Sequence, residues 1–219
     1  MSLEQLHLFQ LVSPALPVGA FSYSEGLEVL VQAGALIDGE AVRAWLEAEL
    51  QRGLVAIEAA ALPALMADLG ADHWDRAAER DGWLLAQREA PELRAQQRQM
   101  GASLLQLLAD LGWPLPCALG WTGAWAWAGV ALRLSPEAVL QAYLYGWTAN
   151  QLSAAVRLVP LGPTEAQRIQ LALAPLLQVR AQELQQHVGS WPPPLFSGGV
   201  GAGLAQLRHA ELYSRLFRS

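Results

Sequence analysis

Two long uncharged stretches constrain the fold of this chain more than any other feature of its sequence. Residues 112–132 contain no Asp, Glu, Lys or Arg, over about the length of a membrane-spanning helix, and residues 138–156 are uncharged as well. Pro114 and Pro116 interrupt the first stretch, and its tryptophans are spread along it rather than gathered at its ends. Two central helices of a water-soluble bundle explain both stretches at lower cost. A membrane protein is the alternative, and it predicts a need for detergent.

The rest of the sequence has helical patterns and no competing strand pattern. Between residues 88 and 111, apolar side chains recur at spacings of three, four and seven. Gly101 lies in the middle of this helix, where glycine costs about 1 kcal/mol relative to alanine, so we expect another segment to approach it closely. Asp38 and Ser135 are typical N-caps, and Thr164 with Gln167 matches a capping box. The predicted fold class is all-α, a single-domain bundle of roughly 8–10 helices.

The C-terminal part of the chain differs in composition from the part before it. We expect residues 1–189 to form a helical core domain, residues 190–203 a Pro/Gly-rich linker, and residues 204–219 a C-terminal docking tail. Within this tail, arginines lie along one side of a predicted helix and aromatic and aliphatic side chains supply apolar anchors. A basic, aromatic tail on an acidic protein is typical of a docking peptide, and a fraying terminus is the alternative.

The segment of residues 13–28, SPALPVGAFSYSEGLE, combines prolines, glycines, serines and two carboxylates at the entrance to the first long helical region. Its prolines predict an extended turn, and the pattern becomes helical from Ser22 or Ser24, either of which is a suitable cap. Glu25 and Glu28 would then lie in or near the first turn and share one helix face. Two interpretations stay open: a well-capped helix start, or a rigid loop presented to a partner or substrate.

Composition excludes several classes of function. The net charge of −6 and pI near 5.2 argue against a nucleic-acid-binding protein, and the absence of lysine excludes a Walker A motif and a Schiff base on the chain. Glu4 and His7 form one ExxH motif without a second copy, and the four histidines lack ligand spacing, so we expect no metal site and no cofactor within one chain. One cysteine and an acidic start without a signal-peptide pattern favour a cytoplasmic location.

Four segments together resemble the family of the urease accessory protein UreF. They are SPALPVGAFSYSEGLE at 13–28, REAPELRAQQRQMGASLLQLL at 88–108, YLYGWTANQLSAAVRLVPLG at 143–162 and RHAELYSRLFRS at 208–219. The likeness extends over essentially the whole chain, and the opening and closing segments are the most specific. The sequence departs from the family's pattern at Gln97, Pro163, Ala166, Ala210 and Leu212.

This resemblance implies an all-helical, cytoplasmic, typically homodimeric protein that is not an enzyme. Members of the family bridge UreD/UreH and the nickel-carrying GTPase UreG, and the assembly inserts nickel into apo-urease. The opening segment and the central helix are assigned by resemblance to partner contact, and the C-terminal tail to UreD/UreH. The expected partner-binding residues are Pro17, Gly19, Tyr23, Ser24, Glu25, Glu28, Arg88, Glu89, Arg94, Gln99, Arg157, Tyr213, Ser214, Arg215, Leu216, Phe217, Arg218 and Ser219.

Two further hypotheses concern chemistry. Control of the UreG GTPase has been proposed for the family, and Arg157 or Arg88 would act there as an arginine finger, a contribution that can be worth about 10³–10⁵ in rate. The competing class is a small all-α enzyme that uses Glu25 and Glu28 as an acid–base pair. In that case, replacing both carboxylates would abolish activity and leave partner binding intact.

Overall fold

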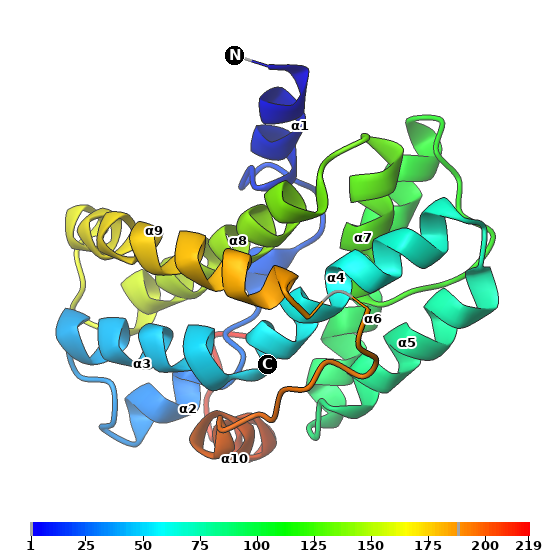
Figure 1. The fold of residues 1–219 in the computed structure, drawn as a ribbon. Helices are drawn as coiled ribbons and strands as arrows, with labels where there is room; N and C mark the ends of the chain where they lie inside the picture. Colours follow the sequence, from blue (N-terminus) through cyan, green and yellow to red (C-terminus); the bar gives the residue numbers. More distant parts are fainter. Residues whose placement is uncertain (1, 188) are drawn as a thin grey trace.

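The computed structural model describes residues 2–187 and 189–219, and these residues form α-helices and two short 3₁₀ helices without a strand (Figure 1). This confirms the predicted all-α fold. The helices are α1 (Leu3–Leu11), α2 (Leu27–Gln32), α3 (Gly39–Arg52), α4 (Leu54–Gly70), α5 (Trp74–Ala86), α6 (Pro91–Asp110), α7 (Trp121–Ala131), α8 (Pro136–Leu158), α9 (Pro163–Gln185) and α10 (Val200–Arg208), and the 3₁₀ helices are η1 (Ala20–Ser22) and η2 (His209–Glu211).

Three helices form the centre of the molecule. α4 packs against both α7 and α8, while α6 covers α7 and α9 covers α8. Most side chains of α4 and of α7 are buried, because α7 has no charged residue and α4 has only two, Glu58 and Asp68, among apolar ones. The uncharged stretches therefore supply central helices, as predicted, although the helix in the first stretch begins only at Trp121. α1 projects from one end of this assembly (Figure 1).

The length and hydropathy of a helix decide whether it could span a membrane. Within the described residues, no single helix is both long and apolar enough to cross a bilayer. The pair α3 and α4 passes this test only when taken together, and the two helices are bent by 41° at the break between them.

Two helix starts are capped by a side chain of their own segment, as predicted. The side chain of Asp38 accepts a hydrogen bond from the amide of Ala41, and the hydroxyl of Ser135 accepts one from the amide of Ala138, so both predicted N-caps are confirmed. The predicted capping box of Thr164 and Gln167 is wrong. α9 begins two residues earlier than that box requires, at Pro163, because proline suits the first helical position, and Gly162 is left as the cap.

The start of α7 is capped from another helix. The carboxylate of Asp81, on α5, accepts hydrogen bonds from the amides of Gly120 (2.7 Å) and Gly123 (3.2 Å). Burial raises the pKa of Asp81, and the two amide hydrogen bonds oppose that rise. This contact replaces the side-chain cap that Gly120 lacks, and it fixes α7 to α5.

Gly101 lies where another segment reaches α6, as predicted. A Cβ atom on this residue would lie 2.5 Å from the backbone of both Leu119 and Gly120, just before α7. Any side chain here would therefore push α6 away from the start of α7. The cost of a glycine within a helix is offset by this close packing.

The C-terminal residues return to the body of the molecule. α10 begins inside the predicted linker and ends inside the predicted tail, and it packs against α2. After η2, the last residues run alongside the opening segment near α2 (Figure 1). The division into core, linker and docking tail stays a prediction, since contact with the core does not exclude a separate binding role.

Candidate functional site

The opening segment has a different conformation from the predicted helix start. Glu25 has a φ of 51° and Gly26 a φ of 89°, both in the left-handed region, so a right-handed helix cannot run through them. α2 begins only at Leu27, and neither Ser22 nor Ser24 caps it. The prediction of one helix over Glu25 and Glu28 is therefore wrong: Glu25 precedes the helix, and the two carboxylates do not share a helix face.

The end of the chain binds this opening segment through backbone hydrogen bonds. The carbonyl oxygen of Ser219 accepts hydrogen bonds from the amides of Ser24 (2.7 Å) and Glu25 (3.1 Å) and from the hydroxyl of Ser24 (2.8 Å). The amide of Arg218 donates to the carbonyl of Ser22 (2.9 Å). Ser24 and Ser219 are both buried, so these bonds are shielded from water.

Glu28 holds the same end of the chain from α2. Its carboxylate accepts hydrogen bonds from the amides of Leu216 (2.7 Å) and Phe217 (3.1 Å), and its Oε2 atom lies 3.3 Å from Nε2 of His209. Glu28 and His209 are buried. Hydrogen bonds to a charged acceptor are stronger than those to a neutral one, so Glu28 is the main anchor of this segment.

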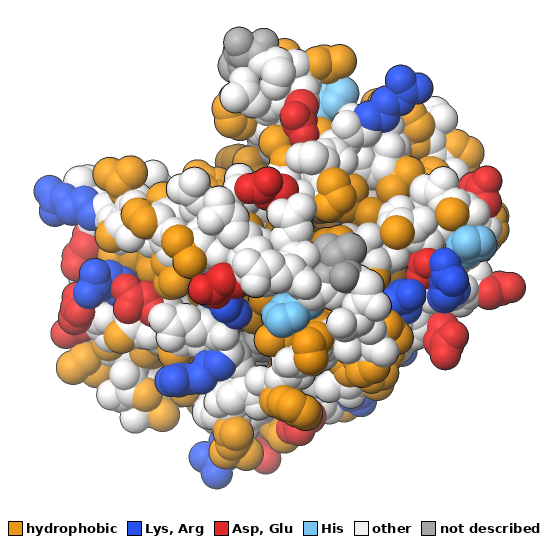
Figure 2. Space-filling model, viewed as in Figure 1, with side chains coloured by type: hydrophobic (Ala, Val, Ile, Leu, Met, Phe, Trp, Pro, Cys, Tyr) orange, Lys and Arg blue, Asp and Glu red, His pale blue; other side chains and the backbone are white. Residues whose placement is uncertain are grey.

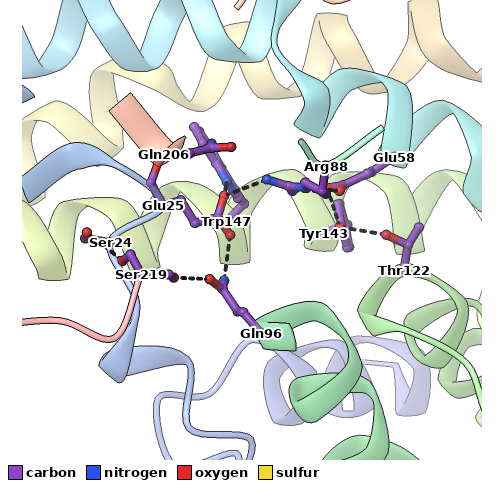
Figure 3. Close-up of polar contacts among 10 residues, drawn as sticks. All are labelled: Ser24, Glu25, Glu58, Arg88, Gln96, Thr122, Tyr143, Trp147, Gln206 and Ser219. Carbon is purple, nitrogen blue, oxygen red and sulfur yellow. Dashed lines mark hydrogen bonds and ion pairs between the residues drawn. The ribbon is translucent and has the colours of Figure 1, made fainter. Parts of the chain in front are cut away.

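A buried ionic network lies next to the opening segment (Figure 3). Arg88, in the turn before α6, donates to Glu58 of α4 through Nε (2.8 Å) and Nη2 (2.6 Å), and its Nη1 atom lies 3.4 Å from Oε2 of Glu25. The hydroxyl of Tyr143 donates to the other oxygen of Glu58 (3.0 Å) and lies 3.1 Å from the hydroxyl of Thr122. The network thus joins α4, α7, α8 and the turn before α6.

Burial and charge act in opposite directions on this network. Burial raises the pKa of Glu58, and the nearby guanidinium of Arg88 opposes that rise. Burial disfavours the charge of Arg88, but the carboxylates of Glu58 and Glu25 raise the pKa of its guanidinium. Burial and the charge of Glu58 raise the pKa of Tyr143, which stays a neutral donor. Arg88 and Glu58 therefore form a charged, desolvated ion pair in which each residue depends on the other.

Glu25 connects the network to the two chain segments described above. Its carboxylate accepts hydrogen bonds from Nε2 of Gln96 (2.9 Å) and Nε1 of Trp147 (3.2 Å), and its carbonyl accepts one from Nε2 of Gln206 on α10 (3.2 Å). Gln96 also accepts a hydrogen bond from the hydroxyl of Ser219. The unusual backbone of Glu25 is thus held by contacts to four separate parts of the chain.

The predicted site residues divide by exposure. Six of them are buried and use their polar groups or rings inside the chain: Tyr23, Ser24, Glu28, Arg88, Phe217 and Ser219. Three are intermediate: Gly19, Glu25 and Arg94. The remaining nine are exposed: Pro17, Glu89, Gln99, Arg157, Tyr213, Ser214, Arg215, Leu216 and Arg218. The partner-binding assignment stays a prediction, and it applies most directly to the exposed group.

Sequence reasoning missed several residues of this site. Glu58 was not singled out, although a lone carboxylate within the apolar sequence LVAIEAAALPALM is a signal of a buried ion pair. Trp147 follows Tyr143 by four residues, so a helical pattern places both on one face, but it indicates no polar partner for the indole. Gln96 and Gln206 carry no sequence signal, because nothing in the pattern tells which amide side chain will meet a carboxylate from a distant segment.

The geometry does not support the enzyme alternative. The carboxylate of Glu25 is engaged by Arg88, Gln96 and Trp147, whereas that of Glu28 is engaged by two backbone amides and His209. The two carboxylates therefore belong to separate hydrogen-bond sets and do not face a shared substrate. In the ExxH motif, Glu4 accepts from the amide of Ser135 and His7 lies beside the carbonyl of Leu132, so both attach α1 to the turn before α8.

The two candidate arginine fingers differ in accessibility. Arg88 is 2 % exposed and paired with two carboxylates, so it cannot reach a nucleotide on another protein in this conformation. Arg157 is exposed, donates to the carbonyl of Phe21 (3.1 Å), and its guanidinium carbon lies 4.4 Å from the centre of the Phe217 ring. Of the two, Arg157 alone can meet a partner.

The fold and this site define an all-helical protein whose conspicuous polar residues join its own segments. Comparison with known proteins places it further: the chain belongs to the UreF family, whose family model matches residues 36–174.

Relatives that match over nearly their whole length carry the name of the same family. The chain is 41% identical to "Urease accessory protein UreF" of Ralstonia pickettii, over 97% of this chain and 96% of the relative. It is 39% identical to the protein of the same name in Alkalilimnicola ehrlichii, over 99% and 96% of the two chains, and 38% identical to that of a Nostoc species, over 98% and 95%. These names describe accessory proteins rather than enzymes, in agreement with the expectation that this chain is not an enzyme.

Proposed function

We propose that this chain is a scaffold in urease maturation that bridges UreD/UreH and the GTPase UreG to apo-urease, so that nickel enters the urease active site. Its membership of a family of urease accessory proteins supports the general role. The bridging role rests on the exposed surface described below. Nickel is cargo of the assembly in this proposal rather than a cofactor of this chain, and a cytoplasmic location is part of it.

One observation carries the proposal: the tail and the opening segment form one continuous surface. We call it the paired-segment surface and define it by the exposed residues Phe21, Tyr213, Arg215, Leu216 and Arg218. Phe21 is 70% exposed, Leu216 52%, and Tyr213 fully so. Aromatic, aliphatic and arginine side chains are enriched in protein interfaces, and a folded protein exposes them together mainly where a partner covers them. We assign this surface to UreD/UreH.

A homodimer is a further part of the proposal. α1 exposes Leu3, Leu6 and Phe9, and an apolar groove that includes Phe9 and Tyr145 runs between α1, α8 and α9. The groove lies on a different set of helices from the paired-segment surface, so a second copy and UreD/UreH could be bound at once.

Size-exclusion chromatography of purified proteins tests the bridging role. The chain should co-elute with UreD/UreH, and adding UreG with GTP should shift that complex to a larger size, whereas UreG should not join UreD/UreH when this chain is omitted. Co-elution of UreG with UreD/UreH in the absence of this chain, or no ternary complex in its presence, would contradict the proposal.

Control of UreG turnover is a second candidate function, favoured by the exposed guanidinium of Arg157. If Arg157 acts as an arginine finger, the parent chain should raise the rate of GTP hydrolysis by UreG about 10³-fold or more. Arg157→Ala should abolish that increase while the complex still forms. The measurement is the rate of phosphate release by UreG with the parent chain and with the variant. A UreG rate that does not respond to the parent chain excludes this candidate.

A further inference from the structure

A cavity of about 330 Å³ lies between α3, α8 and α10, and Glu25 and Arg88 line part of it. Trp45 of α3 and Trp147 of α8 form part of its wall, with ring centres 6.1 Å apart and planes tilted by 37°. Glu25, Glu49 and Glu89 also line it. The cavity thus combines an aromatic pair with three carboxylates.

The negative charge of this cavity is not fully compensated. Arg88 is the one guanidinium in its lining among the described residues, and Arg88 is already paired with Glu58 and Glu25. Glu49 makes no hydrogen bond or ion pair with any residue that the structure describes, apart from its helix backbone. Burial raises the pKa of Glu49 to about 6; Arg88 and Arg52 oppose the rise, and Glu25 adds to it. A cation placed beside Glu49 would relieve this unfavourable burial.

The rim of the cavity is apolar and exposed. Phe196 is 93% exposed, Val200 69% and Leu204 52%, and all three line the cavity: Phe196 before α10, Val200 at its start and Leu204 within it. Their spacing of four residues places Val200 and Leu204 on one face of α10. Hydrophobic side chains are visible over α10 at the bottom of the view in Figure 2. An occupant must therefore offer apolar contacts around a positive charge.

The chemistry of the lining selects the kind of cation. The described residues contain no group of three or more His, Cys, Asp or Glu side chains placed to hold a metal ion, so these carboxylates do not form a metal site. Tryptophan rings beside carboxylates suit a guanidinium or an ammonium group, which stacks on an aromatic face and pairs with an acid. A small free ammonium compound would leave the apolar rim uncovered.

We propose that this cavity receives the arginine or lysine side chain of a partner protein, carried on an apolar segment that packs against Phe196, Val200 and Leu204. The positive side chain lies against the wall that Trp45 and Trp147 form and pairs with Glu49, and its apolar neighbours cover the rim. The cavity shares no lining residue with the paired-segment surface, and the proposal requires none of the partners named above, so it can fail or hold independently of the scaffold role.

A pair of tripeptides tests the chemistry on the intact protein. The probe is acetyl-leucyl-arginyl-leucinamide, and the control replaces arginine with citrulline, which has nearly the same shape without the charge. At millimolar concentration the arginine peptide should shift the indole NMR signals of Trp45 and Trp147, assigned by Trp→Phe variants, and leave that of Trp113 unchanged. The citrulline peptide should bind about tenfold more weakly or worse, since bonds to charged groups are the stronger ones. Equal binding of the two peptides, or no selective shift, overturns the proposal.

Variants of Glu49 test the assigned partner of the charge. Glu49→Gln should weaken the arginine peptide about tenfold, whereas Glu47→Gln, the same change on the same helix outside the cavity, should not. For the parent chain, affinity should fall as pH falls through about 6, where Glu49 gains a proton. Circular dichroism checks folding, and the exposed Glu89→Gln provides a second variant with the same expected direction. An unchanged affinity in both cavity variants, or a doubling of molecular mass in place of peptide binding, contradicts the proposal.

Discussion

Replacing Arg88 with methionine is expected to lower the free energy of unfolding by about 3–5 kcal/mol. The substitution removes the positive partner of Glu58 and Glu25 but leaves Glu58 buried at 4% exposure, where a carboxylate without a partner is costly. Methionine keeps much of the volume of the side chain, so the loss reports on charge rather than on a cavity. Urea denaturation near neutral pH measures it.

Two control variants separate charge pairing from other effects of losing an arginine. Arg43→Met removes an arginine whose ion pairs with Glu40 and Glu47 lie at the surface, and it should cost less than about 1 kcal/mol. Adding Glu58→Gln to Arg88→Met should recover part of the loss, because the uncompensated charge is gone. Equal losses for Arg88→Met and Arg43→Met would show that the buried network contributes no more than a surface pair.

Gly101→Ala is expected to lower the free energy of unfolding by about 1–3 kcal/mol, although alanine favours helices. The new Cβ would lie 2.5 Å from the backbone of Leu119 and Gly120, which cannot move without displacing the start of α7. The matched control is Gly82→Ala on α5, where no atom lies within 4 Å of the new Cβ. The free energy of unfolding of that variant should rise by up to about 1 kcal/mol. If thermal or urea denaturation showed that both variants are more stable than the parent chain, the close approach at Gly101 would be contradicted.

Features set by neighbours along the chain could be predicted from the sequence. The helices, the caps at Asp38 and Ser135, and the close approach at Gly101 all follow from local rules about propensity, capping and glycine. The capping box at Thr164 failed because two local rules compete there, and the proline at position 163 decided the helix start.

The contact between the opening segment and the last residues of the chain could not be predicted from such local rules. Backbone amides and carbonyls make most of it, and every sequence supplies these groups, so no residue pattern marks which of them will meet. The backbone of Glu25 follows from the same contact: its positive φ is unusual for a residue with a side chain and is held in place by distant partners.

The resemblance to a family assigns a role to each of two segments without indicating how the segments lie relative to each other. It implies partner contact for the opening segment and contact with UreD/UreH for the tail, as two separate assignments. In the structure, Ser219 lies against Ser24 and Glu25, so the two segments form one unit. A partner that binds either segment would therefore also meet the other, so two of the proposed contacts would lie on one surface.

The affinity of UreD/UreH for two matched leucine variants tests the central claim most directly, namely that the paired-segment surface is a docking surface. Leu216 is 52% exposed on that surface, and Leu111 is 49% exposed at the end of α6. Neither truncation should change stability by more than about 0.5 kcal/mol. Leu216→Ala should weaken UreD/UreH binding by about tenfold, and Leu111→Ala should leave it unchanged. Binding to Leu216→Ala as tight as to the parent chain would contradict the claim.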